Sequence, residues 1–222
     1  MLTLLTIIAL GGKPTPVLVE LFTSEGCSSC PAADQTLQWL EAAQPVAGIE
    51  VVVLSLHVDY WNSLGWADPF SSPQFTARQE AYGKQMYTPQ MVVEGEAAFV
   101  GNKQRALEVL SQQRGAPRAQ VTLSAKLKDS RIEVSAATDA PDPLWVALAE
   151  SGLTHPVLRG ENRGQSLSHT AVVRQLVRVG PDGKVSLRLE PGWKLDQLKV
   201  VAFVQQAPQG KVLGLAWLKP IP

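Results

Sequence analysis

The chain has 222 residues, of which 45% are apolar and 18% are charged, so it can bury sizeable cores and is not an intrinsically disordered segment. Its 20 basic and 20 acidic side chains cancel, which argues against a protein built to bind nucleic acid or an anionic membrane. Two cysteines are too few for a disulfide-stapled miniprotein or a four-cysteine zinc site.

The first feature in chain order is a short apolar run at residues 2–10, followed by two glycines. It is too short to cross a bilayer as a helix, but it suits the apolar region of a secretory signal, although the usual basic residues before it are missing. Residues 1–13 are therefore predicted to be a leader that directs the protein to the periplasm or out of the cell. A buried first strand is the alternative. No later apolar run reaches the length of a membrane span, so none is expected in the mature protein.

The next hundred residues alternate strands and helices. An apolar run at residues 17–22 predicts a strand, residues 28–43 predict a helix, and the nearly continuous apolar run at 50–56 predicts a strand covered on both faces. A right-handed β–α–β crossover makes these two strands parallel. The unit is completed by an irregular aromatic segment, a helix, a hairpin and a last helix, at residues 57–73, 74–85, 90–100 and 103–113.

After Pro117 the apolar period changes to two, which predicts strands. Their number and length favour an antiparallel sandwich of immunoglobulin size. The charge also changes, since residues 1–115 carry 6 basic and 11 acidic side chains and residues 116–222 carry 14 and 9. We therefore predict an α/β domain at 14–116 and an all-β domain at 117–222. The expected strands are 119–127, 131–138, 144–150, 172–179, 184–190, 198–206 and 211–218.

Cys27 and Cys30 form a C-x-x-C motif between the first strand and the first helix. At the helix N-terminus, unpaired N–H groups and the helix dipole favour a Cys27 thiolate, and Cys30 lies one turn further on. The arrangement predicts that Cys27 attacks a substrate disulfide and that Cys30 resolves the mixed disulfide. A small structural disulfide is the alternative. Zinc is disfavoured, because there is no second cysteine pair and no histidine near the motif.

A strand–CxxC–helix–strand unit with Thr88-Pro89 before a hairpin resembles the thioredoxin superfamily. Four longer runs resemble an uncharacterised bacterial family of secreted thioredoxin-like proteins, domain of unknown function 1223. The resemblance spans both predicted domains and implies an α/β thioredoxin-like domain followed by an all-β immunoglobulin-like sandwich. The runs are ELFTSEGCSSCPAAD at 20–34, HVDYW at 57–61, YTPQMVV at 87–93 and RGENRG at 159–164.

The thioredoxin resemblance implies roles for residues outside the CxxC. Pro89 matches a cis-proline that faces the two cysteines and, with Thr88, holds the substrate backbone; an ordinary proline at a strand entry is the alternative. Glu20 matches a buried carboxylate that carries a proton for the resolving cysteine, although the loop to Cys27 is one residue longer here. If Glu20 is buried, desolvation raises its pKa and suits it to general-base work. Otherwise it faces solvent or a Lys/Arg partner.

His57 directly follows the second strand, at the end of a parallel sheet where α/β proteins place their sites. With Tyr60, Trp61 and Trp66 it forms a candidate wall beside the thiols, and His57, Tyr60 and Trp61 are candidate substrate-binding residues. The alternative is a capping or core histidine, with the aromatic rings packed against the helix at 74–85.

A long connection at residues 154–170 contains the run Arg159–Gly164 and His169. A loop of this length is often functional, so we expect the β domain to position a substrate or to form a dimer. The alternative is an ordered turn that contacts the first domain, with Arg159 or Arg163 paired to its acidic surface. Neither a Ser-His-Asp arrangement nor a phosphate-binding glycine loop is recognisable in the sequence.

The sequence thus predicts a thiol–disulfide oxidoreductase of the cell envelope. Its substrates are expected to be protein or small-molecule disulfides or dithiols, and it needs no metal and no cofactor besides its own Cys27–Cys30 disulfide. One alternative is a copper-handling protein that binds Cu(I) through Cys27, Cys30 and His57, because soft thiolates suit Cu(I). Another is a non-catalytic adaptor with a fixed disulfide.

Overall fold

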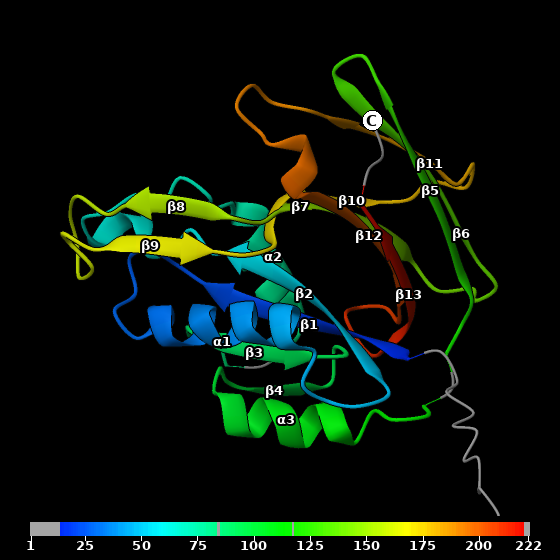
Figure 1. Cartoon of the computed structure of the whole chain (residues 1–222), viewed down its shortest axis with the longest axis horizontal. Helices are drawn as coiled ribbons and strands as arrows, with labels where there is room; N and C mark the ends of the chain where they lie inside the picture. The colour runs from blue at the N-terminus through cyan, green and yellow to red at the C-terminus, as the bar shows by residue number, and fades with distance from the viewer. Residues whose placement is uncertain (1–13, 84, 117, 220–222) are drawn as a thin grey trace, which may run out of the picture.

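The structure is a computed structural model that describes residues 14–83, 85–116 and 118–219. The predicted leader at 1–13 and Pro117 at the predicted boundary lie outside the described residues. The fold is mixed α/β, with few helices around a large sheet of eight strands in the order β13–β12–β7–β10–β2–β1–β3–β4 (Figure 1). Two smaller sheets, β11–β6–β5 and β8–β9, complete it. No helix in the described part of the chain is long and apolar enough to cross a membrane.

The first half of the chain forms the strand and helix elements that its apolar pattern predicts. β1 and β2 pair in parallel along their whole length, from Thr15–Ile49 to Thr23–His57. The β3–β4 hairpin adds antiparallel to the other edge of β1. The elements are β1 (Thr15–Thr23), α1 (Cys30–Ala43), β2 (Ile49–His57), the short 3₁₀ helix η1 (Asn62–Leu64), α2 (Pro73–Ala81), β3 (Gln90–Val93), β4 (Ala97–Val100) and α3 (Lys103–Ser111).

Helices α1 and α2 lie on opposite faces of the β1–β2 pair (Figure 1). Strand alternation explains how β1 serves both helices. The side chain of Glu20 contacts Arg78 of α2, whereas that of Thr23, three residues later, contacts Asp34 of α1. The two faces of β1 therefore carry different polar groups, and only the face that carries Thr23 lies against α1, the helix that starts at Cys30.

All seven strands predicted for the second half are present, with their ends shifted by at most a few residues. The structure corrects the prediction of a separate sandwich, however, because β10 pairs in parallel with β2 at Val172–Ser55. At this point the second half of the chain bonds the edge of β2 that β1 leaves open, where the Ser55 N–H donates to the Ala171 carbonyl at 2.8 Å. The strands are β5 (Val121–Lys128), β6 (Arg131–Thr138), β7 (Leu144–Glu150), β10 (Val172–Arg178), β11 (Lys184–Arg188), β12 (Leu198–Gln205) and β13 (Val212–Leu218).

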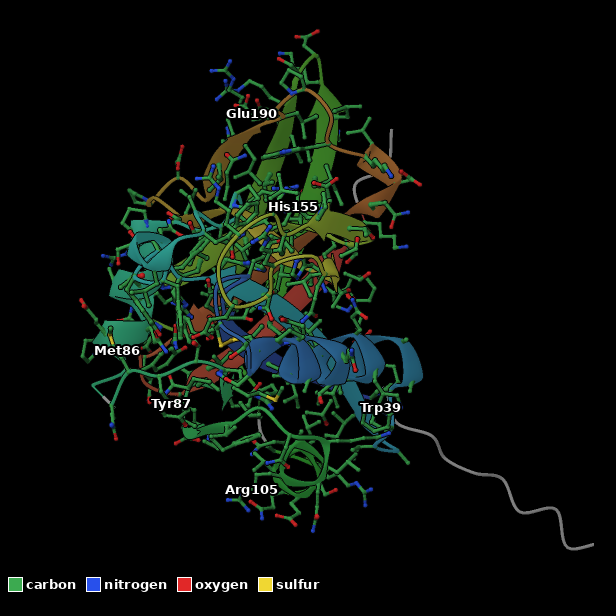
Figure 2. All side chains as sticks on the ribbon, turned by 90° about the vertical axis from the view of Figure 1, so that its left-hand side faces the viewer. Trp39, Met86, Tyr87, Arg105, His155 and Glu190 are labelled. Atoms are coloured by element: carbon green, nitrogen blue, oxygen red, sulfur yellow. A yellow bond between two sulfur atoms is a disulfide. The ribbon has the colours of Figure 1, made fainter. Side chains whose placement is uncertain are left out.

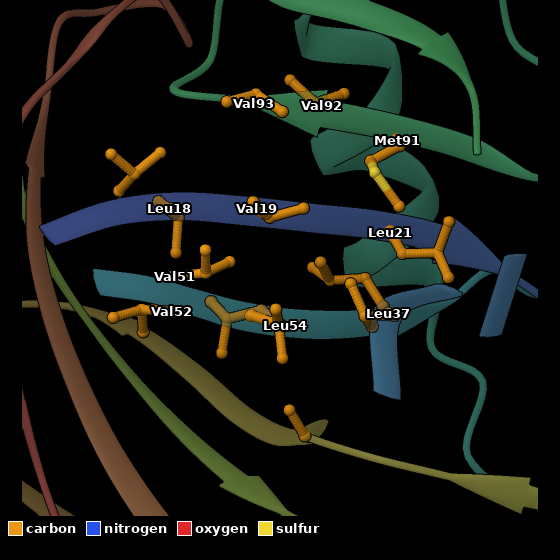
Figure 3. Close-up of a cluster of buried hydrophobic side chains, with 14 of the residues drawn as sticks. Leu18, Val19, Leu21, Leu37, Val51, Val52, Leu54, Met91, Val92 and Val93 are labelled. Carbon is orange, nitrogen blue, oxygen red and sulfur yellow. The ribbon is translucent and has the colours of Figure 1, made fainter. Parts of the chain in front are cut away.

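Strands β7 and β12 have both faces buried and so belong to two hydrophobic cores. Ala147 and Phe203 face the larger core, which β1, β2, β3 and the helices share and part of which Figure 3 shows. Val146 and Ala202, each one residue earlier in its strand, face the sheet β11–β6–β5. The strands β7, β10, β12 and β13 of the second half therefore belong to the same sheet as the strands of the first half. The division of the chain into two domains at residues 116/117 stays a prediction.

The sequence interpretation missed a two-stranded ladder in the long connection at 154–170. β8 (Leu153–Pro156) pairs with β9 (Ser166–His169), and the Gln38 amide of α1 donates to the Ser168 carbonyl at 2.8 Å. The loop that joins β8 to β9 lies at the same end of the molecule as the N-terminus of α1 (Figure 1). A second short 3₁₀ helix, η2 (Leu195–Gln197), precedes β12.

Candidate functional site

The two cysteines form a disulfide at the N-terminus of α1, as their spacing predicts. Their Cα atoms are 5.4 Å apart, and Cys30 is the first residue of the helix. Cys27 is 1% exposed and Cys30 is fully buried, whereas Ser28 and Ser29 between them are exposed. The disulfide therefore lies just below the surface.

The Thr88–Pro89 peptide bond is cis, and Pro89 immediately precedes β3. The Trp61 indole N–H donates to the Thr88 hydroxyl at 2.8 Å. Gly26 lies against the same tryptophan, because a Cβ on this glycine would be 3.2 Å from the Trp61 Cβ. Trp61 thus connects the cis-proline turn to the residue before Cys27.

Tyr60 lies between Thr88 and α2. Its hydroxyl donates to the Gln79 side chain of α2 at 3.3 Å, and burial raises the pKa of this half-buried tyrosine. The structure therefore brings Trp61 and Thr88 to the disulfide loop, and Tyr60 bonds both Thr88 and Gln79 of α2.

Glu20 is buried and has the arginine partner that the sequence left open as an alternative. Arg78 donates to its carboxylate from Nε at 2.6 Å and from Nη2 at 3.0 Å, and the Tyr82 hydroxyl donates to it as well. Gln205 of β12 bonds both Arg78 and Tyr82. Burial and the neighbouring Glu20 charge raise the pKa of Tyr82 above its usual range. This network links β1, α2 and β12, and it lies on the sheet face away from α1.

Asp34 is a buried carboxyl that sequence reasoning missed. It lies one helical turn after Cys30, so the two side chains share one face of α1. The Thr23 hydroxyl donates to it at 3.1 Å, and burial raises its pKa from 3.8 to about 7. A group with this pKa exchanges protons readily near neutral pH. The i, i+4 spacing to a cysteine was the signal that could have found it.

The three histidines of the chain gather around the segment that leads into Cys27. The Glu25 carboxylate is fully buried and accepts from His155 Nδ1 at 3.0 Å, from His169 Nε2 at 3.0 Å and from Trp66 Nε1 at 2.9 Å. Burial alone would raise the pKa of Glu25, but these three donors lower it below its usual value. Figure 2 views the molecule from this end and labels His155.

His57 and Asp68 extend the cluster. His57 Nδ1 lies 2.7 Å from an Asp68 oxygen that also accepts from the Glu25 backbone N–H at 2.8 Å. Burial would raise the pKa of Asp68, but the adjacent His57 ring lowers it below its usual value. His57 is fully buried, and its ring lies 4.9 Å from that of His169. The structure therefore places His57 in the core beneath the loop, not on a surface that a substrate touches.

The loop between β8 and β9 contacts the CxxC segment directly. The Asn162 amide donates to the Glu25 carbonyl at 2.8 Å and to the Cys27 carbonyl at 3.0 Å, and the Glu161 carboxylate accepts from the Ser28 N–H at 2.9 Å. The predicted contact between the two halves thus exists, but neither Arg159 nor Arg163 makes it. A helix N-terminus presents N–H groups and a partial positive charge, so it attracts a carboxylate and not a guanidinium.

A cavity of about 260 Å³ lies between α1 and β9, and Asp34 is one of its lining residues. It gives this buried carboxyl a polar neighbourhood next to the disulfide. A larger cavity of about 1020 Å³ lies at the other end of α1, around Glu41 and Lys199. No residue of the CxxC segment lines it. Among the described residues, no set of three or more His, Cys, Asp or Glu side chains is arranged to hold a metal ion.

A family profile described as "Protein of unknown function (DUF1223)" matches residues 18–205. The chain belongs to this family. The matched region includes the disulfide, the cis-proline turn and the β8–β9 loop. The resemblance that the sequence motifs indicated is therefore confirmed for the family.

Two solved structures resemble this DUF1223 protein over nearly its whole length. Protein AGR_C_4864 from Agrobacterium tumefaciens has a TM-score of 0.68 and 28% identity, over 93% of this chain and 95% of that one. HBP35 of Porphyromonas gingivalis has a TM-score of 0.63 and 17% identity, over 95% of this chain and 76% of that one, a likeness of fold alone. The curated proteins contain no match.

Proposed function

We propose that this DUF1223 protein is a thiol–disulfide oxidoreductase whose first half is thioredoxin-like and whose reaction takes place at Cys27 and Cys30. The observation that carries the proposal is the Cys27–Cys30 disulfide at the N-terminus of α1, joined through Trp61 to the cis bond before Pro89. A helix N-terminus favours a thiolate, and a cysteine three residues further on, at the start of the helix, is placed to displace a bound partner.

The reaction balances as a two-electron exchange. In the reduced protein, the Cys27 thiolate attacks one sulfur of a substrate disulfide, the substrate S–S bond breaks, and the departing substrate sulfur takes a proton. Cys30 then loses its proton and attacks Cys27 in the mixed disulfide, which releases the second substrate thiol. The substrate is reduced to a dithiol and the protein is oxidised to the disulfide, and the reverse sequence oxidises a substrate dithiol.

Asp34 is the base that we assign to the second step, in place of Glu20. Its position one turn after Cys30, its burial and its pKa of about 7 suit it to accept the Cys30 proton. Glu20 lies on the opposite face of β1 and already accepts from Arg78 and Tyr82. Replacing Asp34 with Asn is expected to slow release of the substrate from the mixed disulfide by about 10²-fold.

We further infer that the substrates are proteins or small molecules that carry disulfides or dithiols, and that the protein's own disulfide is its redox group. The predicted leader at residues 1–13 supports a periplasmic or secreted location, where such disulfides persist. Thr88 and Trp61, on the surface next to the disulfide loop, are the assigned contacts for the substrate chain.

Substitution of the resolving cysteine tests the proposal. The Cys30→Ser variant keeps the nucleophile but cannot release a partner, so it should accumulate mixed disulfides that a reductant dissolves. These adducts are detected by non-reducing gel electrophoresis and mass spectrometry of envelope extracts. Cys27→Ser is the matched control and should trap far less. Absence of adducts on Cys30→Ser, under oxidising and reducing conditions alike, would refute the proposal.

A second candidate is a non-catalytic adaptor in which the disulfide is a fixed structural link. The burial of both cysteines favours it. The reduction potential separates the two functions, since structural disulfides typically lie below about −300 mV and catalytic pairs of this kind lie between about −120 and −270 mV. A value in the structural range, together with no turnover of small disulfides, would favour the adaptor.

A further inference from the structure

The loop that joins β8 to β9, residues 157–165, contacts the segment that carries the disulfide. Two backbone hydrogen bonds close this loop at its base, from Val157 N to the Gln165 carbonyl at 2.9 Å and from Gly164 N to the Val157 carbonyl at 2.8 Å. At the tip, Gly160 lies against Trp66, where a Cβ on the glycine would be 3.1 Å from the Trp66 Cβ. The 157–165 loop is thus a compact unit that sits on the disulfide segment from the other half of the chain.

Asn162 anchors the tip of this loop. Its side chain is 1% exposed, and its Nδ2 group donates to two backbone carbonyls, one on each side of Gly26. One of these carbonyls belongs to Cys27 itself. Cys27 is 1% exposed, so the clamp holds the backbone of a residue whose side chain is buried.

Glu161 acts on the same segment through charge. Its carboxylate accepts from the Ser28 N–H, at the end of α1 where the helix dipole would otherwise stabilise a Cys27 thiolate. A negative charge at this point offsets the dipole and repels the thiolate, so it raises the pKa of Cys27 in the reduced protein. Because Glu161 is exposed, its contact with Ser28 can break without disturbing the hydrophobic core.

We propose that the 157–165 loop is a lid that controls the Cys27–Cys30 pair in two ways: Asn162 holds it closed over the sulfur, and Glu161 keeps the covered Cys27 a poor nucleophile. Opening the lid both exposes Cys27 and removes the opposing charge, so that reactivity appears only when a partner has displaced the loop. Glu161 and Asn162 are positioning residues, because they act on the sulfur through the backbone. The inference rests on the proposed thiol–disulfide function.

Other titratable groups face the Cys27 segment from the elements packed against it, and they stay constant in the comparison that tests the lid. Five of them hold each other through the Glu25 and Asp68 hydrogen bonds, and Asp34 accepts from Thr23. Substitutions at Glu161 and Asn162 remove none of these bonds. The groups are Glu25, Asp68, His57, Asp34, His155 and His169.

Two readouts on the full chain separate access from charge. The first is the rate at which dithiothreitol reduces the disulfide of the oxidised protein. The second is the Cys27 pKa of the reduced protein, from the pH dependence of its alkylation by iodoacetamide. Glu190→Gln is the matched control, because Glu190 is exposed at the far end of the molecule (Figure 2).

Asn162→Asp has nearly the same shape as asparagine but cannot donate to either carbonyl. Together with Asn162→Ala, it should raise the reduction rate by about tenfold, as expected for loss of two hydrogen bonds of modest net strength. Glu161→Gln keeps the clamp and removes the charge, so it should lower the Cys27 pKa by about half a unit. Glu161→Ala should both raise the reduction rate and lower the Cys27 pKa, because it also removes the contact with Ser28. The Glu190→Gln control should change neither the rate nor the pKa.

Reduction rates of both Asn162 variants within twofold of wild type would overturn the lid. A Cys27 pKa that stays unchanged or rises in both Glu161 variants would overturn the role of Glu161. Because Glu161 is exposed, its variants remain informative if replacing the buried Asn162 prevents folding. Both readouts use small reagents, so they are independent of whether Cys30→Ser captures a partner. If the Asn162 and Glu161 variants behave as expected but Cys30→Ser captures no partner, the lid inference stands and the oxidoreductase function is rejected.

Discussion

Two buried carboxyl groups on opposite faces of β1 illustrate how surroundings decide what an acid can do. Glu20 accepts from Arg78 and Tyr82 in a network that ties three elements together. Asp34 accepts from a neutral Thr23 hydroxyl, and burial raises its pKa to about 7 although the nearby His169 and this hydrogen bond lower it. The acid with a cation partner is a structural element, whereas the acid with only a neutral donor can gain and lose a proton near neutral pH. Burial by itself does not make a proton carrier.

The largest effect is expected from removing the Arg78 cation, which distinguishes the surroundings of Glu20 from those of Asp34. Arg78→Met leaves the Glu20 carboxylate buried without its partner, so the free energy of unfolding should fall by about 3–5 kcal/mol. Urea denaturation followed by circular dichroism measures the loss. The double variant Arg78→Met, Glu20→Gln should recover a large part of it, because no charge is then left unpaired. Equal losses in the single and double variants would contradict this account of Glu20.

Asp34 should give a pH dependence of stability. Its pKa is 3.8 without burial and about 7 in the fold, so the folded protein holds a proton that the unfolded chain releases in this range. Stability therefore falls as the pH rises from about 4 to about 7, by up to about 4 kcal/mol. Asp34→Asn removes this loss and should be more stable than wild type at pH 8, with little difference at pH 4.

Urea denaturation of both proteins between pH 4 and pH 8 checks the Asp34 prediction. Asp182→Asn, in an exposed hairpin loop, is the control and should follow wild type at each pH. Parallel curves for wild type and Asp34→Asn would mean that this carboxyl titrates normally in the fold. Asp34 would then be no better suited than Glu20 to serve as the base for Cys30.

The smallest expected effect concerns the second donor of Glu20. Tyr82→Phe removes the hydroxyl that donates to the carboxylate but leaves Arg78 in place. A hydrogen bond to a charged group contributes about 1.5–3 kcal/mol, so the unfolding free energy should fall by this amount and less than for Arg78→Met. Thermal and urea unfolding measure it. A larger loss than for Arg78→Met would show that the tyrosine, not the cation, holds Glu20.

Much of this structure could be predicted because it depends on local patterns. The apolar runs of β1 and β2 and the alternation in β5 and β6 predict strands at nearly the observed bounds. The C-x-x-C between a predicted strand and a predicted helix placed Cys27 and Cys30 at a helix N-terminus. These features are encoded within a few neighbouring residues, whereas the cis bond before Pro89 was implied by the resemblance to thioredoxins.

What was missed depends on partners far away in the sequence. β8 and β9 are four residues long and half exposed, so their apolar pattern is too weak to reveal strands. Asn162 bonds the carbonyl of Cys27 across 135 residues, and nothing near it in the sequence indicates this partner. The pairing of β10 with β2 is similarly distant, which is why the second half was expected to form a sandwich of its own.

The sequence by itself determined the order of strands and helices, the place of the disulfide on a helix end and the family of the chain. The tertiary structure decided which buried acid is free to titrate, which histidines support the loop before Cys27, and that the second half of the chain contacts the disulfide segment. The physical reason is that propensity and periodicity act over neighbouring residues. Charge pairing, desolvation and access, by contrast, depend on groups that only the folded chain brings together.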